Sequence, residues 1–473
     1  MIYKKNASNY LTGLIILAGL ILRAYLTLHK SMWLDEVITF MLAKLPFIDL
    51  IFQNNRYWDY SHPSGYYLLV KLWSFFGTSE IFLRLPALLS YLVSVYFLKK
   101  ISDYFNSKFI TFLLLTIFVF HPLLVQLGFE LRMYSIIIPI FLGIIYLLFR
   151  YFLVNEKNIG CKVTIVLLTI VSFYIDYASI WLIGVMISMA FVLVSSKSKN
   201  GGDFLKLCLI IILGISPQIY ILLVHFSELE KLNVGLNDII QNDGFHQLAD
   251  LVGLGPLNIM GALLLVILVV FTSALTYKSI LKKDMKFPIY LLVSLGVLLP
   301  LYIVMSFSIT IYSLFRTRNL VLVVIFVIIS IGFILEKIKL NVYLKIFLFC
   351  FIVLYGTNSF LIIIHDDFRF KIDWKKVRTE VTNKRCSIIY IGPEKFRYEM
   401  IVWSEYYSKY PNRIPYTLQI INRLDKNSIQ IKNVNAKCAL IFSSESIEKN
   451  IQQNWVNSSP YCIKNTCKLF FFK

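Results

Sequence analysis

The sequence is poor in charged residues, which make up 16% of its 473 positions, and poorest in acidic ones: Asp and Glu number 27, against 47 Lys and Arg. Hydrophobic residues make up 58%. Many of them form uninterrupted runs of about 18–20 residues, the length that crosses a hydrocarbon core of about 30 Å. A soluble protein with so many such runs would aggregate. The sequence therefore predicts a polytopic, α-helical membrane protein.

Several other features are missing. No internal repeat and no low-complexity segment is visible, and no Cys or His spacing resembles a zinc site. No small-x-small cleavage site follows the first apolar run, so we interpret that run as a retained helix and not as a signal peptide. A net charge of +20 would suit a nucleic-acid-binding protein. However, most Lys and Arg lie in short loops between apolar runs, as the positive-inside rule expects, so we predict no nucleic-acid partner.

Hydropathy and loop charge together predict about eleven transmembrane helices. Residues 66–76 are apolar enough to be counted as a further span, but counting them would put the lysine-rich loops outside. We therefore expect a helix in the outer interface there, after a chain break at Pro63 and Gly65. This count makes the N-terminus cytoplasmic, in the plasma (inner) membrane. The predicted spans are residues 11–28, 84–98, 109–126, 134–152, 163–175, 179–194, 204–225, 256–277, 287–307, 319–335 and 342–364.

The composition changes at residue 366, which predicts a membrane domain over residues 1–365, with a first external loop over 29–83, and an extracytoplasmic domain over 366–473. Alternating patterns in the second part indicate strands at 387–391, 439–443 and 468–472, and helices at 395–407 and 446–455. We expect a small α/β soluble domain.

Four of the seven cysteines lie in this last part of the chain. In an exported domain they could form disulfides, with Cys462–Cys467 as the easiest loop and Cys386–Cys438 as the remaining pair. Four free thiols are the alternative.

Two adjacent carboxylates, Asp35 and Glu36, follow the first span in the stretch SMWLDE. Charge at the membrane surface is costly unless it is used or neutralised. Because neighbours on a helix point in different directions, the two residues do not suit a close acid–nucleophile pair. We interpret one as a general base and the other as its structural partner or a ligand. The alternative is that both cap a helix over residues 36–45.

Further polar residues gather at the outward ends of the predicted spans. Four are arginines, on the side where short-loop cations are disfavoured, and a guanidinium pairs well with phosphate. The alternatives are contact with lipid headgroups and ion pairing with nearby acids. These residues are Asp59, His62, Arg84, Glu130, Arg132, Tyr134, Asp176, Tyr177, Arg316 and Arg318.

Two His-Pro pairs, His62-Pro63 and His121-Pro122, could supply metal ligands, but His-Pro at a helix break is more often structural, and we predict no metal site. The aromatic residues around the first loop fit interfacial anchors better than sugar-stacking platforms. They are Trp33, Trp58, Tyr66, Tyr67 and Trp73.

Four ordered pieces of sequence resemble a known family. They are WLDE at 33–36, HPSGYYLLVKLW at 62–73, RLP at 84–86 and ELRMYS at 130–135. Together they resemble the GT-C superfamily of membrane glycosyltransferases, in the bacterial branch related to protein O-mannosyltransferases and the aminoarabinose transferase of lipid A. The resemblance covers residues 10–190 well, whereas Arg318 and Asp373-Trp374 match more loosely.

The resemblance implies a polyprenyl-phosphate-linked sugar donor and transfer on the extracytoplasmic face, with Asp35 as the base. The chain departs from the family at Ser64-Gly65, where HPPL is usual, and at Asn319, where Arg-Tyr is usual. The second departure makes Arg316 a competitor of Arg318 for the phosphate. By the same resemblance the donor site would be lined by Glu36, His62, Arg84, Glu130, Arg132, Tyr134 and Arg318. Separately from the resemblance, we place Asp59, Asp176 and Tyr177 near the acceptor or behind the site.

The sequence thus predicts an inverting hexosyl- or pentosyltransferase of the cell envelope, acting on an unknown hydroxyl acceptor in a lipid, glycan or protein. It indicates no cofactor. This hypothesis expects Asp35, Arg84 and Arg132 to converge in one cavity. A lipid-linked sugar flippase or transporter is one alternative, although charged residues at mid-membrane and a repeat would then be expected. A non-catalytic membrane subunit of envelope glycan assembly is the other.

Overall fold

The computed structural model describes residues 2–51, 62–231, 267, 270–271, 273–279, 286–307, 321–337 and 343, and five strands between residues 388 and 472. The chain divides into two compact units. The first contains Met1–Ala24, Ile51–Tyr66 and Pro86–Ile363, and the second contains Tyr25–Leu50, Tyr67–Leu85 and Ile364–Lys473. The predicted domain boundary at residue 366 stays a prediction.

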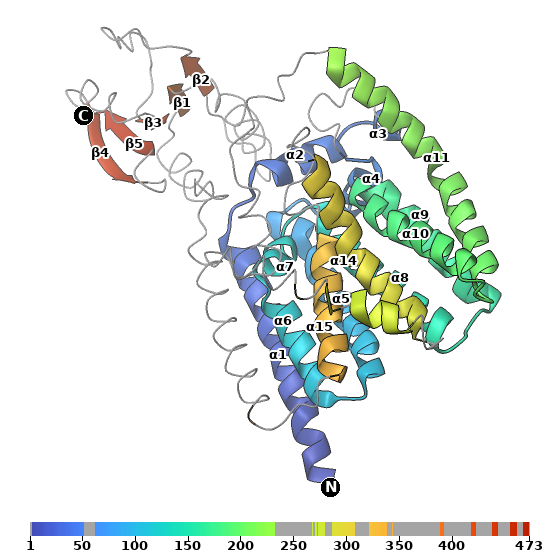
Figure 1. The fold of residues 1–473 in the computed structure, drawn as a ribbon. Helices are drawn as coiled ribbons and strands as arrows, with labels where there is room; N and C mark the ends of the chain where they lie inside the picture. Colours follow the sequence, from blue (N-terminus) through green and yellow to red (C-terminus); the bar gives the residue numbers. More distant parts are fainter. Residues whose placement is uncertain are drawn as a thin grey trace. The chain divides into compact units, whose positions relative to one another are not determined.

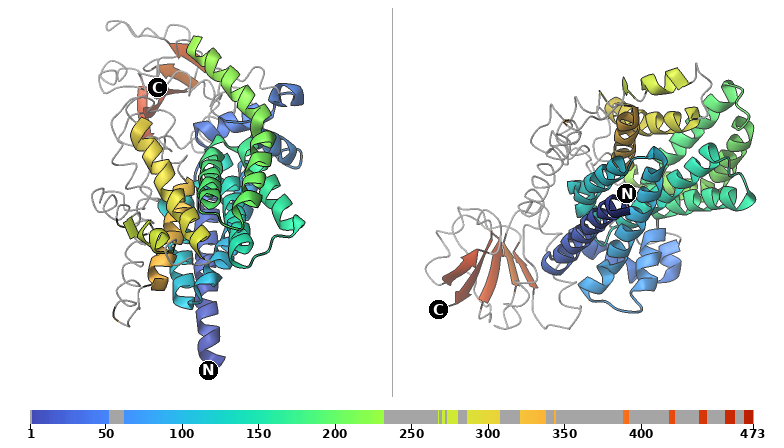
Figure 2. Two further views of the ribbon diagram at one scale, coloured as in Figure 1. Left: turned by 45° about the vertical axis from the view of Figure 1, so that its right-hand side comes forward. Right: turned by 90° about the horizontal axis from the view of Figure 1, so that it is seen from below.

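Long apolar helices make up most of the first unit (Figure 1). Helices α9, α10 and α11 lie side by side (Figure 2), and α15 packs against α6, α8 and α14. The helices are α1 (Ile2–His29), α5 (Glu80–Ser102), α6 (Lys108–Phe120), α7 (Pro122–Leu127), α8 (Met133–Leu153), α9 (Ile159–Ile175), α10 (Ile180–Ser195), α11 (Gly201–Lys231), α14 (Phe287–Phe307) and α15 (Val321–Lys337), with short 3-10 turns η1 (Asp103–Phe105) and η2 (Tyr177–Ser179).

Helices α8 and α15 form the core of this unit. Nearly every side chain of α15 is buried, and so are most of those on α8. A helix that is apolar on all faces is stable only where all of those faces are covered. The sequence of α15, VLVVIFVIISIGFILEK, has that character.

The outer helices instead expose large apolar side chains. Leu14 of α1 is 62% exposed and Leu213 of α11 is 72% exposed. Within the part of the chain that the structure describes, five helices are long and apolar enough to cross a membrane, over Tyr10–His29, Glu80–Phe105, Met133–Leu153, Tyr177–Ser195 and Gly201–Val224. Their exposed apolar faces suit contact with acyl chains, and the protein is a multi-pass membrane protein. The count of eleven spans stays a prediction, because much of residues 256–277 and 342–364 lies outside the described part.

One predicted span is not continuous. At His121 the backbone has a ψ of 122° and is not helical. This residue divides the predicted span over residues 109–126 into α6 and α7. Pro122 has no N–H and disfavours helical geometry at the residue before it. The predicted span therefore contains a break in its helix, and the interpretation of His121-Pro122 as a structural break agrees with the geometry.

Short helices lie between the first two of these candidate spans. They are α2 (Leu34–Ala43), α3 (Phe47–Ile51) and α4 (Gly65–Trp73). Helix α4 has nine residues, about 13 Å at the usual rise of 1.5 Å per residue, which is too short to cross a bilayer. This length agrees with leaving it out of the count of spans.

The last part of the chain contains two small sheets. Strands β1 (Ile388–Ile391) and β2 (Leu418–Ile421) pair in parallel, and β3 (Cys438–Phe442), β5 (Cys467–Phe472) and β4 (Trp455–Pro460) form an antiparallel sheet in that order. Strands β1, β3 and β5 coincide with the three predicted strands to within one residue, whereas β2 and β4 were not predicted. Trp455 begins β4 and does not end a helix. The other residues of both predicted helices, with Cys386 and Cys462, lie outside the described part, so the α/β class and both disulfides stay predictions.

Candidate active site

Helix α2 carries both adjacent carboxylates in its first turn. The carboxylate of Glu36 reaches back to the start of the helix, where its Oε2 accepts a hydrogen bond of 3.1 Å from the backbone N–H of Trp33. A carboxylate at this position satisfies an N–H that has no partner within the helix and interacts favourably with the positive end of the helix dipole. The alternative interpretation from the sequence, that Glu36 caps the start of a helix, is therefore correct.

Glu36 is also paired with Arg84, from the first turns of α5. The Nε of Arg84 donates to Oε1 over 2.7 Å, and its Nη2 donates to Oε2 over 2.5 Å. Both side chains are fully buried. This is the bidentate guanidinium–carboxylate geometry that gives the strongest charge-assisted pairs.

The remaining N–H groups of Arg84 donate to backbone carbonyls at the end of α1. Nη1 donates to Thr27 O (3.3 Å) and Lys30 O (2.8 Å), and Nη2 donates to Ser31 O (3.1 Å). A guanidinium has five N–H groups, and these contacts use all five. Arg84 therefore ties the last turn of α1 to the first turn of α2, and in this structure it has no N–H group left for a phosphate.

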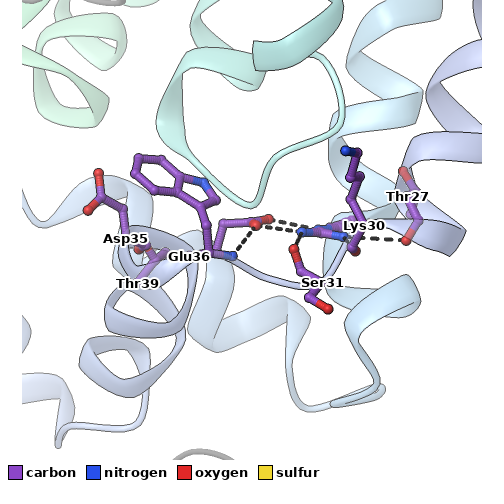
Figure 3. A network of polar contacts seen from close by, with 8 residues as sticks. Thr27, Lys30, Ser31, Asp35, Glu36 and Thr39 are labelled. Carbon is purple, nitrogen blue, oxygen red and sulfur yellow. Dashed lines mark hydrogen bonds and ion pairs between the residues drawn. The ribbon is translucent and has the colours of Figure 1, made fainter. Parts of the chain in front are cut away.

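Asp35 has a different environment from its neighbour. Its side chain is half-buried and points away from the Glu36–Arg84 contacts (Figure 3). Its backbone carbonyl accepts a hydrogen bond of 2.7 Å from Thr39 Oγ1, one turn later. The prediction that the two carboxylates diverge is confirmed, and only Glu36 belongs to this capping network.

A second polar cluster lies in the first unit. Arg132 Nη2 lies 3.1 Å from Nε2 of His62, and Nδ1 of His62 lies 3.9 Å from Oδ1 of Asp176. All three side chains are buried. Because arginine only donates hydrogen bonds, Nε2 of His62 must accept, which puts the ring proton of a neutral histidine on Nδ1, toward Asp176.

Two of these residues lie at the ends of helices. Arg132 is the N-cap of α8, and its backbone N–H donates to Glu130 O over 2.8 Å. Asp176 ends α9, and its Oδ1 caps η2 by accepting from Ala178 N over 3.0 Å. The fully buried ring of Tyr134 stands edge-on to His62, with centroids 6.2 Å apart. Glu130 is buried as well.

Gly65 explains one departure from the family pattern. A Cβ atom at this position would collide with the backbone carbonyl oxygen of Tyr174, near the end of α9. The start of α4 therefore lies directly against the segment that leads to Asp176. The chain has glycine here because no side chain fits between the two backbones.

The structure thus brings together two subsets of the predicted residues. One is Glu36 with Arg84, and the other is His62 with Arg132, Tyr134 and Asp176. Tyr177 is held from α11, where Gln218 Nε2 donates to its hydroxyl over 2.7 Å. Asp59, Arg316 and Arg318 lie outside the described residues, and the convergence of Asp35 with Arg132 stays a prediction. Within the described part of the chain, no group of three or more His, Cys, Asp or Glu residues could hold a metal ion.

Sequence reasoning missed Arg23, a buried arginine in the middle of the first span. Its Nη1 donates to Gly19 O and Val119 O at distances of 3.1 Å, and its Nη2 donates to Leu124 O at 3.3 Å. Val119 and Leu124 flank the break between α6 and α7, so Arg23 stabilises carbonyl groups on both sides of that break. A lone charge within an apolar run was the available signal.

Comparison with known proteins identifies the fold of this chain. No known family profile and no curated protein matches this sequence. The crystal structure of ArnT from Cupriavidus metallidurans bound to undecaprenyl phosphate superposes with a TM-score of 0.57, covering 97% of each chain at 10% sequence identity. The chain has the ArnT fold. The apo structure of the same protein gives a TM-score of 0.57 over 98% of each chain, at 11% identity. The predicted resemblance to the branch that includes the aminoarabinose transferase of lipid A is thus confirmed for the fold.

Proposed function

We propose that this protein is an inverting membrane glycosyltransferase, which moves a sugar from a polyprenyl-phosphate donor to an acceptor hydroxyl on the extracytoplasmic face of the plasma membrane. The observation that carries this proposal is the similarity in fold to ArnT over 97% of both chains. That relative was crystallised with undecaprenyl phosphate, which supports a lipid phosphate as the leaving group here.

Asp35 is the general base in this proposal. It accepts the proton of the acceptor hydroxyl while the oxygen attacks the anomeric carbon, and the bond from that carbon to the phosphate oxygen breaks with its electron pair. One displacement inverts the anomeric configuration. Glu36 is unsuited to this role, because both of its oxygens already accept hydrogen bonds from Arg84.

Arg132 stabilises the departing phosphate. Its contact with His62 is with the lone pair of a neutral ring, so this partner holds the guanidinium in place without cancelling its charge. A fixed cation in a buried site is the arrangement that favours a developing phosphate anion. The carboxylate of Asp176, 3.9 Å from Nδ1 of His62, favours by its charge the tautomer that has its proton on Nδ1 and accepts from Arg132.

Arg84 has another role than the phosphate contact expected from the sequence. With all of its N–H groups used by Glu36 and three carbonyls, it acts as a positioning residue. It fixes the first turn of α2 and, with it, the backbone of Asp35.

The test is mass spectrometry of envelope glycans and lipids from cells that lack this protein and are complemented with variants. The wild-type chain should restore a product heavier by one hexose or pentose. Asp35→Asn should remove that product, because the amide cannot take up the proton, while the amount of protein in the membrane stays the same. Arg132→Gln should lower the yield by at least tenfold.

Glu36→Asp is the control for a substitution at the adjacent position, since it keeps a carboxylate for Arg84 and should keep the product. Full product with Asp35→Asn would reject Asp35 as the base. Unchanged lipids and glycans on deletion of the protein would reject sugar transfer itself.

A further inference from the structure

A face of exposed apolar side chains lies on the short helices between the first two spans. It consists of Phe47, Ile48, Leu69, Leu72, Phe75 and Phe76, which we call the α3–α4 face. Phe75 and Phe76 are 68% and 81% exposed. On α4, Leu69 and Leu72 are exposed while Tyr67 and Val70 are buried, so one side of the helix packs on protein and the other does not.

Two lysines border this face. Lys71 of α4 donates to the carbonyls of Ala43 (3.3 Å) and Leu45 (2.7 Å), at the end of α2, and its ammonium lies 5.0 Å from the ring centre of Phe47. Lys71 thereby joins α3 to α4, so the two helices present one continuous surface.

Lys44 follows α2 and lies beside this contact. Its ammonium is 3.4 Å from Ser74 Oγ, and Ser74 in turn donates to Lys71 O over 2.8 Å. Partial burial, and then the charge of Lys71, lower the pKa of Lys44. The charge of Lys71 disfavours the charged form of Lys44, and an anionic group beside the two lysines would oppose that effect.

We propose that the α3–α4 face, with Lys44 and Lys71, is a binding site for anionic phospholipids of the surrounding leaflet. The apolar side chains enter the acyl region, and the two ammonium groups meet the phosphates. Aliphatic lysine stems along apolar surface, with charged ends at headgroup depth, are the usual interfacial arrangement. The site requires neither Asp35 nor Arg132 and is independent of the proposed chemistry.

The place of this surface in the chain favours lipid over a protein partner. The connection that carries the α3–α4 face begins where the candidate span Tyr10–His29 ends, and it ends where the candidate span Glu80–Phe105 begins. A connection between two spans starts and ends at the membrane surface. Apolar side chains at that level meet acyl chains, and ammonium groups meet lipid phosphates.

The experiment uses the full chain in nanodiscs made of equal parts phosphatidylglycerol and phosphatidylcholine. Native mass spectrometry then counts the lipids that stay bound after transfer to detergent. We expect retained phosphatidylglycerol to exceed phosphatidylcholine. Lys44→Gln should lower that preference about fivefold, the factor expected for one basic residue at an anionic leaflet. Lys44→Arg should keep it, and 0.5 M salt should weaken it.

Lys99→Gln is the matched control, since Lys99 is also an exposed lysine, with a side chain 51% exposed. Lys44→Gln is preferred to a change at Lys71, because it leaves the end of α2 intact. Equal retention of the two lipids by the wild-type chain would overturn the proposal, as would an equal effect of Lys99→Gln. The proposal would also be overturned if the wild-type protein formed dimers that the Phe76→Asp substitution dissociates, because a second copy of the chain would then cover this face.

Discussion

Asp35 and Glu36 are adjacent in sequence, but their surroundings differ. Glu36 is fully buried against Arg84, whereas Asp35 is half-buried and points elsewhere. Helical geometry allows the sequence to predict that adjacent side chains diverge. The sequence cannot predict which of the two carboxylates is buried in an ion pair, because that depends on Arg84, which is 48 residues away.

This difference predicts that substitutions at the two positions destabilise the fold by very different amounts. Glu36→Gln leaves the buried charge of Arg84 without its carboxylate and should destabilise the fold by about 3–5 kcal/mol. Asp35→Asn, the matched control, removes an acid that takes no part in this pair and should cost less than about 1 kcal/mol. Thermal unfolding of both variants in the same detergent measures the difference. Equal midpoints for the two would contradict the assignment of Glu36.

At the scale of elements, the contact of α4 with the end of α9 depends on the absence of a side chain at Gly65. Gly65→Ala should push the start of α4 away from Tyr174, disturb the segment that holds Asp176 and lower the thermal midpoint. Gly13→Ala is the control, because nothing lies within 4 Å of a Cβ atom there. In a helix interior that change should stabilise by about 0.5–1 kcal/mol. A Gly65→Ala variant as stable as Gly13→Ala would contradict the close packing.

Element boundaries were predictable where one local signal dominates. Helix α14 has the predicted bounds, residues 287–307, because an apolar run alone determines it. The break at His121 was foreseeable from Pro122, yet hydropathy averages over it. The carbonyl partners of Arg84 and Arg23 could not be predicted. A sequence shows which side chains can donate hydrogen bonds, but not which carbonyls fold within their reach.

At the scale of the whole molecule, the fold of ArnT accommodates this chain although only 10% of aligned residues are identical. Apolar residues that face lipid or a helical core can replace one another with little effect on the fold. The sequence identity between two relatives therefore falls while the order of their helices persists. The four sequence pieces that carried the resemblance lie in the first turns of α2, α5 and α8 and in and before α4, and each contains polar residues, for which such replacement is restricted.

The predicted orientation can be tested on the whole chain. Reporter fusions after Lys99, close to the end of α5, should be active on the cytoplasmic side. Fusions after Arg132, at the start of α8, should be active on the other side, because α6 and α7 lie between the two positions. Both reporters on one side would contradict the proposed topology, and a reversed result would place Asp35 on the cytoplasmic face.

The contacts of Arg84 also bear on how the protein is made. Ribosomes deliver Glu36 to the bilayer before its partner, which follows 48 residues later. During that interval the acid has no guanidinium to neutralise it, and the junction between α1 and α2 is incomplete. Insertion of α5 completes the junction, so nascent chains arrested before Arg84 should be degraded faster than chains arrested after the whole of α5 has been inserted.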